Sequence, residues 1–335
     1  MNLLKNIILC ISLILLFSAK VTSQKINGVC FVSPSSKNLF SNFNSLTRIN
    51  ANWIAITPYA FSKKNEPSVT FNYEHSWWGE QSDGTVFMIK QAKKEGLKVM
   101  LKPHIWVMGE GWCGQFDLKT EEEWLIWEKD YAKYILSNAS IAQKYNIEML
   151  CIGTEYKIAT AKRPVFWENL IRTVRKIYTG KVTYAANWDN YQNISFWQEL
   201  DYIGVDAYFP LSKTQTPNIK TLNTKWIKEV DLLKSFSTQH HKKIIFTEFG
   251  YKSTHFSAWN QWEIENVKQD GNVNLKAQAN AYYSLFNSVW NQQWFEGGFL
   301  WKWYADDDKS GGLKNSDYTP QNKPVEKVIK DWYSY

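Results

Sequence analysis

The chain of 335 residues has few of the residues that build disulfide frameworks and metal centres. Of its four cysteines, Cys10 lies in the N-terminal apolar segment, which leaves Cys30, Cys113 and Cys151. These three have no CxxC spacing and are odd in number, so they indicate no disulfide framework, although one disulfide is left open. The five histidines include no His-x-His pair. We therefore predict no metal site and no cofactor, and we disfavour a metal-dependent hydrolase.

Long apolar runs are also scarce. The longest, Ile7–Phe17, covers about eleven residues, whereas a membrane-spanning helix needs roughly 20. A short segment with one positive charge precedes it, and the small and polar residues Ala19–Ser23 follow. This order is typical of a secretory signal peptide. We predict that residues 1–23 are removed before Gln24 and that the protein is secreted or periplasmic, free of the membrane after cleavage. An uncleaved N-terminal anchor is the alternative.

Charge of one sign is not concentrated anywhere. The net charge is +7, and it falls to +5 once Lys5 and Lys20 leave with the signal peptide. The basic residues are dispersed, whereas nucleic-acid binding calls for a basic stripe, so we exclude a nucleic-acid partner. No linker, internal repeat or low-complexity run interrupts residues 24–335. We expect one domain, and we expect it to act as a monomer.

Aromatic residues, in contrast, are abundant. Trp, Tyr and Phe number 18 each, so tryptophan is as common as phenylalanine. Part of this excess belongs to the core. In an exported protein, an excess of tryptophan also suits stacking on the apolar faces of sugar rings, because the flat side chain buries area and keeps a polar group.

Short, mostly continuous apolar runs alternate with amphipathic segments, which is the pattern of parallel strands covered on both faces. The predicted helices include one that Thr120 begins, with Glu123 three residues later as in a capping box. Strand and helix alternate eight times, which predicts an α/β fold of the (β/α)8 TIM-barrel type with a single domain. A doubly wound open sheet is the alternative, but no Gly-rich phosphate loop follows the first strand. The predicted strands are Ile26–Val32, Asn52–Tyr59, Lys98–Trp106, Ile147–Tyr156, Lys181–Trp188, Tyr202–Pro210, Lys243–Tyr251 and Gly297–Tyr304. The predicted helices are Val86–Glu95, Glu121–Tyr145, Phe166–Tyr178, Thr224–His240 and Leu275–Asn291.

Two glutamates end predicted strands, at the barrel edge where active sites form. Glu155 ends the fourth strand and Glu248 the seventh, so their side chains would converge across the barrel mouth. A carboxylate beside buried apolar residues is costly unless it is paired, so a salt bridge to a basic residue is the structural alternative for each. Cleavage of a glycosidic bond uses one carboxylic acid to protonate the leaving oxygen and one carboxylate to attack or stabilise the sugar. We therefore predict Glu155 and Glu248 as catalytic residues.

The segments around these residues resemble glycoside hydrolase family 113, the β-mannanases. The similar segments run from the third strand to the C-terminus, and the resemblance implies a retaining enzyme with Glu155 as acid/base and Glu248 as nucleophile. They are Lys102-Pro103-His104-Ile105-Trp106, Ile152-Gly153-Thr154-Glu155, Trp167 to Arg172, Tyr184-Ala185-Ala186-Asn187-Trp188, Asp201 to Phe209, Phe246-Thr247-Glu248-Phe249-Gly250-Tyr251 and Tyr318-Thr319-Pro320-Gln321-Asn322-Lys323-Pro324.

The same resemblance suggests roles for other strand-end residues. Tyr208 would hydrogen-bond the nucleophile, and Trp301 would floor the subsite of the reacting sugar. The wider superfamily often has Asn directly before the acid/base, where this chain has Thr154, so the contact to the sugar's 2-hydroxyl is open between His104 and Asn187.

The other aromatic and acidic candidates are less specific. The sequence does not decide whether Trp106, Trp112 and Trp188 line sugar subsites or pack in the core. Trp77-Trp78 in a polar loop is a better candidate for a sugar platform. For Asp306-Asp307-Asp308 a solvated turn is favoured over a calcium loop, because the spacing lacks an EF-hand pattern. Lys102 is placed to neutralise a carboxylate at the barrel mouth.

The leading hypothesis is a retaining glycoside hydrolase that cleaves a β-1,4-linked polysaccharide, most simply mannan or glucomannan, with the polysaccharide or its oligosaccharides as its only partner. The alternative is a non-catalytic carbohydrate-binding barrel, which would keep the aromatic platforms and need neither glutamate.

Overall fold

A computed structural model describes residues 24–110, 112–260, 263 and 273–334. The predicted signal peptide, residues 1–23, lies outside these ranges. Within them, no helix has both the length and the apolar composition that crossing a membrane requires.

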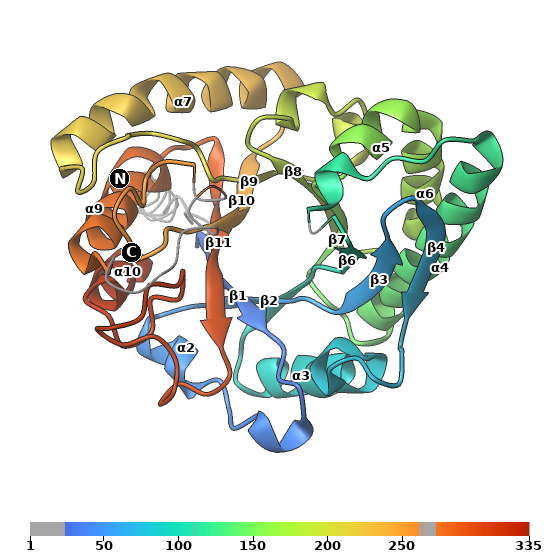
Figure 1. Cartoon of the computed structure of the whole chain (residues 1–335), viewed down its shortest axis with the longest axis horizontal. Helices are drawn as coiled ribbons and strands as arrows, with labels where there is room; N and C mark the ends of the chain where they lie inside the picture. The colour runs from blue at the N-terminus through green and yellow to red at the C-terminus, as the bar shows by residue number, and fades with distance from the viewer. Residues whose placement is uncertain (1–23, 111, 261–262, 264–272, 335) are drawn as a thin grey trace, which may run out of the picture.

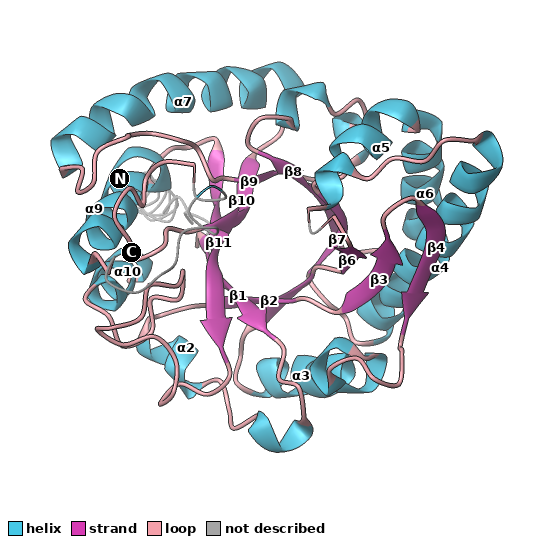
Figure 2. Cartoon of the chain, in the orientation of Figure 1, coloured by secondary structure: helices cyan, strands magenta, loops and turns pink. Residues whose placement is uncertain are grey.

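Eight parallel strands close into a barrel, and helices surround it (Figures 1 and 2). The strands follow one another around the ring in chain order, and the last, β11, pairs with β1 to close it. The barrel strands are β1 (Ile26–Val32), β2 (Trp53–Ile56), β5 (Lys98–Leu101), β7 (Met149–Thr154), β8 (Lys181–Asn187), β9 (Ile203–Asp206), β10 (Ile244–Phe249) and β11 (Phe295–Tyr304). The prediction of a single-domain (β/α)8 barrel is confirmed.

The predicted helices are present, with ends that differ by a few residues. The capping box of α4 is formed, since the Thr120 side chain accepts from the Glu123 N–H and the Glu123 side chain accepts from the Thr120 N–H. Helix α9 continues into one π-helical segment, Phe286–Trp290. The helices are α2 (Asn44–Arg48), α3 (Ser82–Lys94), α4 (Glu121–Lys144), α5 (Lys157–Lys162), α6 (Pro164–Ile177), α7 (Ile219–His240), α9 (Leu275–Leu285) and α10 (Val325–Tyr333).

The core has two layers because side chains alternate between the two faces of each strand. One layer fills the barrel interior and the other lies between the strands and the helices. Cys30 and Cys151 belong to the inner layer, Cys113 is buried elsewhere, and all three are free thiols. The inner layer consists of Ile26, Cys30, Trp53, Ala55, Met100, Met149, Cys151, Ala185, Ile245 and Phe299.

Two predicted strands are wrong as single elements. The segments Asn52–Tyr59 and Lys98–Trp106 each divide at a proline, Pro58 or Pro103, and only their first halves belong to the barrel. Proline has no N–H for the strand ladder and restricts the conformation of the residue before it. Each segment therefore leaves the barrel at its proline. The second halves join a separate three-stranded sheet that the sequence did not predict. Its strands are β3 (Tyr59–Lys63), β4 (Glu66–Phe71) and β6 (His104–Met108), in the order β4-β3-β6.

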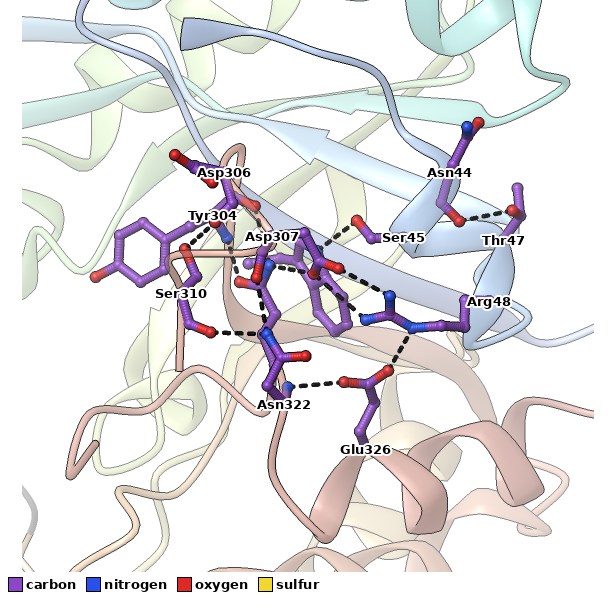
Figure 3. A network of polar contacts seen from close by, with 12 residues as sticks. Asn44, Ser45, Thr47, Arg48, Tyr304, Asp306, Asp307, Ser310, Asn322 and Glu326 are labelled. Atoms are coloured by element: carbon purple, nitrogen blue, oxygen red, sulfur yellow. Dashed lines mark hydrogen bonds and ion pairs between the residues drawn. The ribbon is translucent and has the colours of Figure 1, made fainter. Parts of the chain in front are cut away.

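A polar network links the loop after β11 to α2, near the start of the described chain, and to α10, near its end (Figure 3). Arg48 of α2 pairs with Asp307 at 2.8 Å and with Glu326 of α10 at 2.6 Å. Gln321 also donates to the Asp307 carboxylate, at 2.8 Å. Asp306–Asp308 form a partly exposed turn, as predicted, and the Asp307 carboxylate is in addition held by a guanidinium and an amide. In the described ranges, no group of His, Cys, Asp or Glu side chains has the arrangement of a metal site.

Candidate active site

Glu155 follows directly after β7 and is held in an unusual backbone conformation. Its φ is 56°, in the left-handed region that non-glycine residues enter at a cost of roughly 1–3 kcal/mol. The flanking hydrogen bonds fix this conformation, from Glu155 N–H to the Ala185 carbonyl at 2.8 Å and from Lys157 N–H to the Glu155 carbonyl at 2.7 Å. Strain of this kind persists where the surroundings determine it, and it often marks functional sites.

The surroundings of the Glu155 carboxyl favour its protonated form. Burial raises the pKa of Glu155 well above its usual range, and the negative charges of Asp206 and Glu248 raise it further. The Trp112 indole N–H donates to the carboxyl at 2.6 Å, and this bond and the Lys102 charge lower the pKa by a smaller amount. A carboxyl group in this environment keeps its proton and can donate it.

Glu248 reaches the barrel interior because β10 carries an irregularity. Its pairing with β9 shifts register between Phe246 and Glu248, and its pairing with β11 shifts between Phe246 and Phe249. In a regular strand Glu248 would share the helix-facing side of Phe246. The irregularity instead lets both Thr247 and Glu248 contact side chains of the barrel interior. Bulges next to active sites commonly redirect a side chain in this way.

Three side chains converge on the Glu248 carboxylate. Lys102 Nζ donates to Oε1, Tyr208 Oη donates to Oε2 at 2.8 Å, and His104 Nε2 lies 3.6 Å from Oε1. The salt bridge considered as an alternative for a strand-end glutamate is therefore present at Glu248. It is compatible with catalysis, because the adjacent ammonium compensates the charge of an attacking carboxylate.

Lys102 and Asp206 form a buried charged layer beneath Glu248. Both have no exposed area, and Lys102 Nζ lies 3.5 Å from Asp206 Oδ1. Thr247 donates to the same oxygen at 2.7 Å. Burial and the Glu248 charge raise the pKa of Asp206 to about 7, against the opposing effect of Lys102. The sequence marked Lys102 as a neutralising residue but assigned Asp206 no role, because its contacts depend on strands far apart in the chain.

We expect Lys102→Met to lower the free energy of unfolding by about 3–5 kcal/mol, because it leaves two buried carboxylates without their cation. Urea unfolding followed by tryptophan fluorescence measures the change. The double variant Lys102→Met/Asp206→Asn is the matched control and should regain part of the loss, since it removes one uncompensated charge. A loss below about 1 kcal/mol in the single variant would show that the pair does not stabilise the fold.

His104 and Trp301 lie together beside Glu248. The two rings stack with centroids 6.0 Å apart and planes 4° from parallel. Burial and the Lys102 charge lower the pKa of His104 well below its usual range, so its ring is neutral. His104 Nε2 has no hydrogen-bond partner within the described part of the chain. The Trp301–Lys302 peptide bond is cis.

The remaining predicted residues are Asn187, Trp188 and Trp106. Asn187 ends β8 opposite Asp206, and its side chain accepts from the Trp188 N–H at 2.9 Å. Trp188 is partly buried, with its ring 6.0 Å from that of Phe209. Trp106 is not at a barrel strand end as predicted, because β6 belongs to the three-stranded sheet, where 51% of Trp106 is exposed.

The site thus brings together Glu248, Tyr208, His104 and Trp301, and the negative charge of Glu248 raises the pKa of Glu155. Sequence reasoning left Trp112 undecided between a sugar subsite and the core, and it missed the hydrogen bond to Glu155. Trp112 lies after β6 and far from Glu155 in the sequence, so no local pattern indicated that contact.

The sequence profile of glycoside hydrolase family 113 matches residues 33–323, which include every residue of this site. The chain belongs to glycoside hydrolase family 113. It is therefore a glycoside hydrolase, and a carbohydrate is its substrate. This membership excludes the non-catalytic carbohydrate-binding barrel. The resemblance of the strand-end segments predicted the membership.

Family 113 also supplies structures similar to this one. A family 113 β-mannanase from Alicyclobacillus acidocaldarius superposes with a TM-score of 0.81 at 24% identity, over 93% of this chain and 98% of that one. A family 113 β-1,4-mannanase superposes with a TM-score of 0.79 at 28% identity, over 93% and 99%. A fungal β-1,4-galactanase shares the fold at 14% identity with a TM-score of 0.54, over 90% and 99%. A search of curated protein sequences gave no match.

Proposed function

We propose that this family 113 enzyme cleaves β-1,4-linked mannan or glucomannan with retention of configuration, using Glu155 as acid/base and Glu248 as nucleophile. The observation that carries the proposal is the contrast between the two carboxyl groups. Glu155 lies where burial and negative neighbours favour its protonated form, and Glu248 touches a buried lysine. One carboxyl buried beside negative charges and one paired with an ammonium suit the acid and the nucleophile that glycoside hydrolysis requires.

In the first step of this mechanism, Glu248 attacks the anomeric carbon while Glu155 protonates the departing glycosidic oxygen. The bond to the leaving sugar breaks as the bond to Glu248 forms, and Glu155 becomes a carboxylate. In the second step Glu155 takes a proton from water, the resulting oxygen attacks the anomeric carbon, and Glu248 departs. Two inversions give net retention. The Tyr208 hydrogen bond holds one oxygen of Glu248 so that the other keeps its direction of attack.

The substrate part of the proposal rests on the family and on its β-1,4-mannanase structures. Trp301 would support the reacting sugar through its ring face. His104 Nε2, which has no partner in the described chain and lies beside Glu248, is placed to hydrogen-bond the sugar's 2-hydroxyl. Asn187 is the second candidate for that contact, and Trp188 is a candidate for a neighbouring subsite.

A panel of mannan, glucomannan, xylan and cellulose tests the proposal directly. We expect release of reducing sugar from mannan or glucomannan, and proton NMR of the first product should show the β anomer before mutarotation. Inactivity on all four polymers would refute the substrate assignment, and an initial α anomer would refute retention.

We expect Trp112→Phe to move the basic limb of the pH profile of kcat/KM to higher pH. The indole N–H bond favours the ionised form of Glu155, so its loss raises the Glu155 pKa and keeps the acid protonated further up the pH scale. Profiles on a soluble oligosaccharide measure the shift. Trp294→Phe, which alters a partly buried tryptophan before β11, is the matched control. A basic limb that stays in place or moves to lower pH would contradict the assignment of Glu155 as the acid.

We propose in addition that residues 1–23 direct export, that cleavage leaves Gln24 at the N-terminus, and that the mature enzyme acts as a monomer. The charge and hydrophobicity pattern of the first 23 residues supports export. N-terminal sequencing of the secreted protein and its elution volume in size-exclusion chromatography test these points. Recovery of the full-length chain in the membrane fraction would favour an uncleaved anchor.

A further inference from the structure

The three-stranded sheet has one buried and one exposed face. Ala60 of β3 and Ile105 and Val107 of β6 are buried in the outer core layer. This face lies over α4, where the ring of Phe71 meets that of Tyr134 at 5.1 Å. Because side chains alternate along a strand, the residues between them point the other way. In Figure 1 this sheet lies beside the ring of barrel strands, near α4.

The exposed face carries a row of large apolar side chains, Phe61, Trp106 and Met108, which we call the shelf. The register pairs Phe61 with Trp106 on adjacent strands. Trp106 is 51% exposed and Met108 47% exposed, while Phe61 is half-buried. Single exposed apolar residues are ordinary, but an aligned group on one sheet face indicates a binding surface.

The shelf is continuous with the catalytic site. His104 begins β6 on the same side of the strand as Trp106, and it contacts both Glu248 and Trp301. The rise along a strand places Trp106 about 7 Å from His104 and Met108 about 7 Å farther.

Four charged residues on β3, β4 and the turns next to the shelf form two ion pairs. Lys63 pairs with Glu66 at 2.5 Å, and Lys64 pairs with Glu110 at 3.2 Å. The surface therefore offers an aromatic ring edged by neutralised polar groups, which suits an uncharged sugar whose ring has an apolar face and a hydroxyl rim.

We propose that the shelf is a distal sugar-binding subsite, on which Trp106 stacks against a hexose of the same glycan chain that Glu155 and Glu248 cleave. The proposal rests on the proposed function. It implies that the glycan chain leaves the catalytic site along β6. Substrates too short to reach Trp106 then gain no binding energy from it.

Kinetics on β-1,4-linked mannooligosaccharides of increasing length test this subsite. In Trp106→Ala, the loss in kcat/KM relative to wild type should grow with chain length and reach about tenfold for the longest substrates, mainly through KM. Trp106→Phe keeps a stacking ring and should recover most of the loss. Tyr283→Ala is the matched control, since Tyr283 is an exposed aromatic residue on the outer helix α9.

Three results would overturn the subsite. One is an equal loss in kcat/KM at every chain length, which indicates a structural role for Trp106. Another is no loss at any length. The third is a wild-type dimer in size-exclusion chromatography that Trp106→Ala converts to a monomer without a length-dependent loss, since the shelf would then bind a second copy of the chain. If wild-type enzyme cleaves none of these oligosaccharides, the proposed function fails instead, so the two failures are distinguishable.

Discussion

Glu248→Ala should lose roughly 10⁴–10⁶-fold in kcat on mannan, because the reaction then has no group to form the covalent intermediate. Azide added to this variant should restore part of the turnover on an activated β-mannoside. The small anion can occupy the space of the missing carboxylate and attack the anomeric carbon. With a single displacement, the product is the α-mannosyl azide, in which configuration is inverted.

Tyr208→Phe is the matched comparison for this experiment. It removes the hydroxyl that donates to Glu248 Oε2 but keeps the carboxylate and the ring. Its kcat should fall far less than that of Glu248→Ala, about 10-fold to 100-fold, and azide should have no effect on it. Substantial activity in Glu248→Ala without azide, or a β-configured azide product, would show that another group is the nucleophile.

Glu155→Ala should lose about 10²–10⁴-fold in kcat/KM on mannan, because a sugar alkoxide is a poor leaving group without a proton donor. On an aryl mannoside with an acidic phenol, the first step should be nearly as fast as in wild type. The intermediate should then accumulate, since its hydrolysis lacks the base, and a burst of phenol should be visible before a slow steady state. The basic limb of the pH profile should also disappear.

Glu155→Gln separates proton donation from volume, because the amide can keep the Trp112 hydrogen bond only through its carbonyl oxygen and has no acidic proton. Both variants should therefore lose similar activity on mannan. If the aryl mannoside and mannan lost activity by the same factor in both variants, Glu155 would position the substrate rather than protonate it.

The sequence predicted the features that depend on interactions between residues close together in the chain. Continuous apolar runs report strands covered on both faces, and Thr120 with Glu123 reports a helix start, because each pattern depends on neighbours in the chain. The two glutamates were identifiable for the same reason, since Glu155 directly follows a buried strand and Glu248 lies next to the last residue of another. Pro58 and Pro103 also indicated that two of the predicted strands end early. The continuous apolar runs around these prolines favoured a single strand in each case.

What the sequence by itself determined is the alternation of strands and helices that makes a barrel, and the two carboxylates that lie at its strand ends. Only the tertiary structure decided how those carboxylates differ. Closure of the barrel brings Lys102 and Tyr208 to Glu248, and Trp112 to Glu155, from strands and loops far apart in the chain. A register shift in β10 turns Glu248 inward. These contacts depend on strand register and ring closure, which no local pattern of residues encodes.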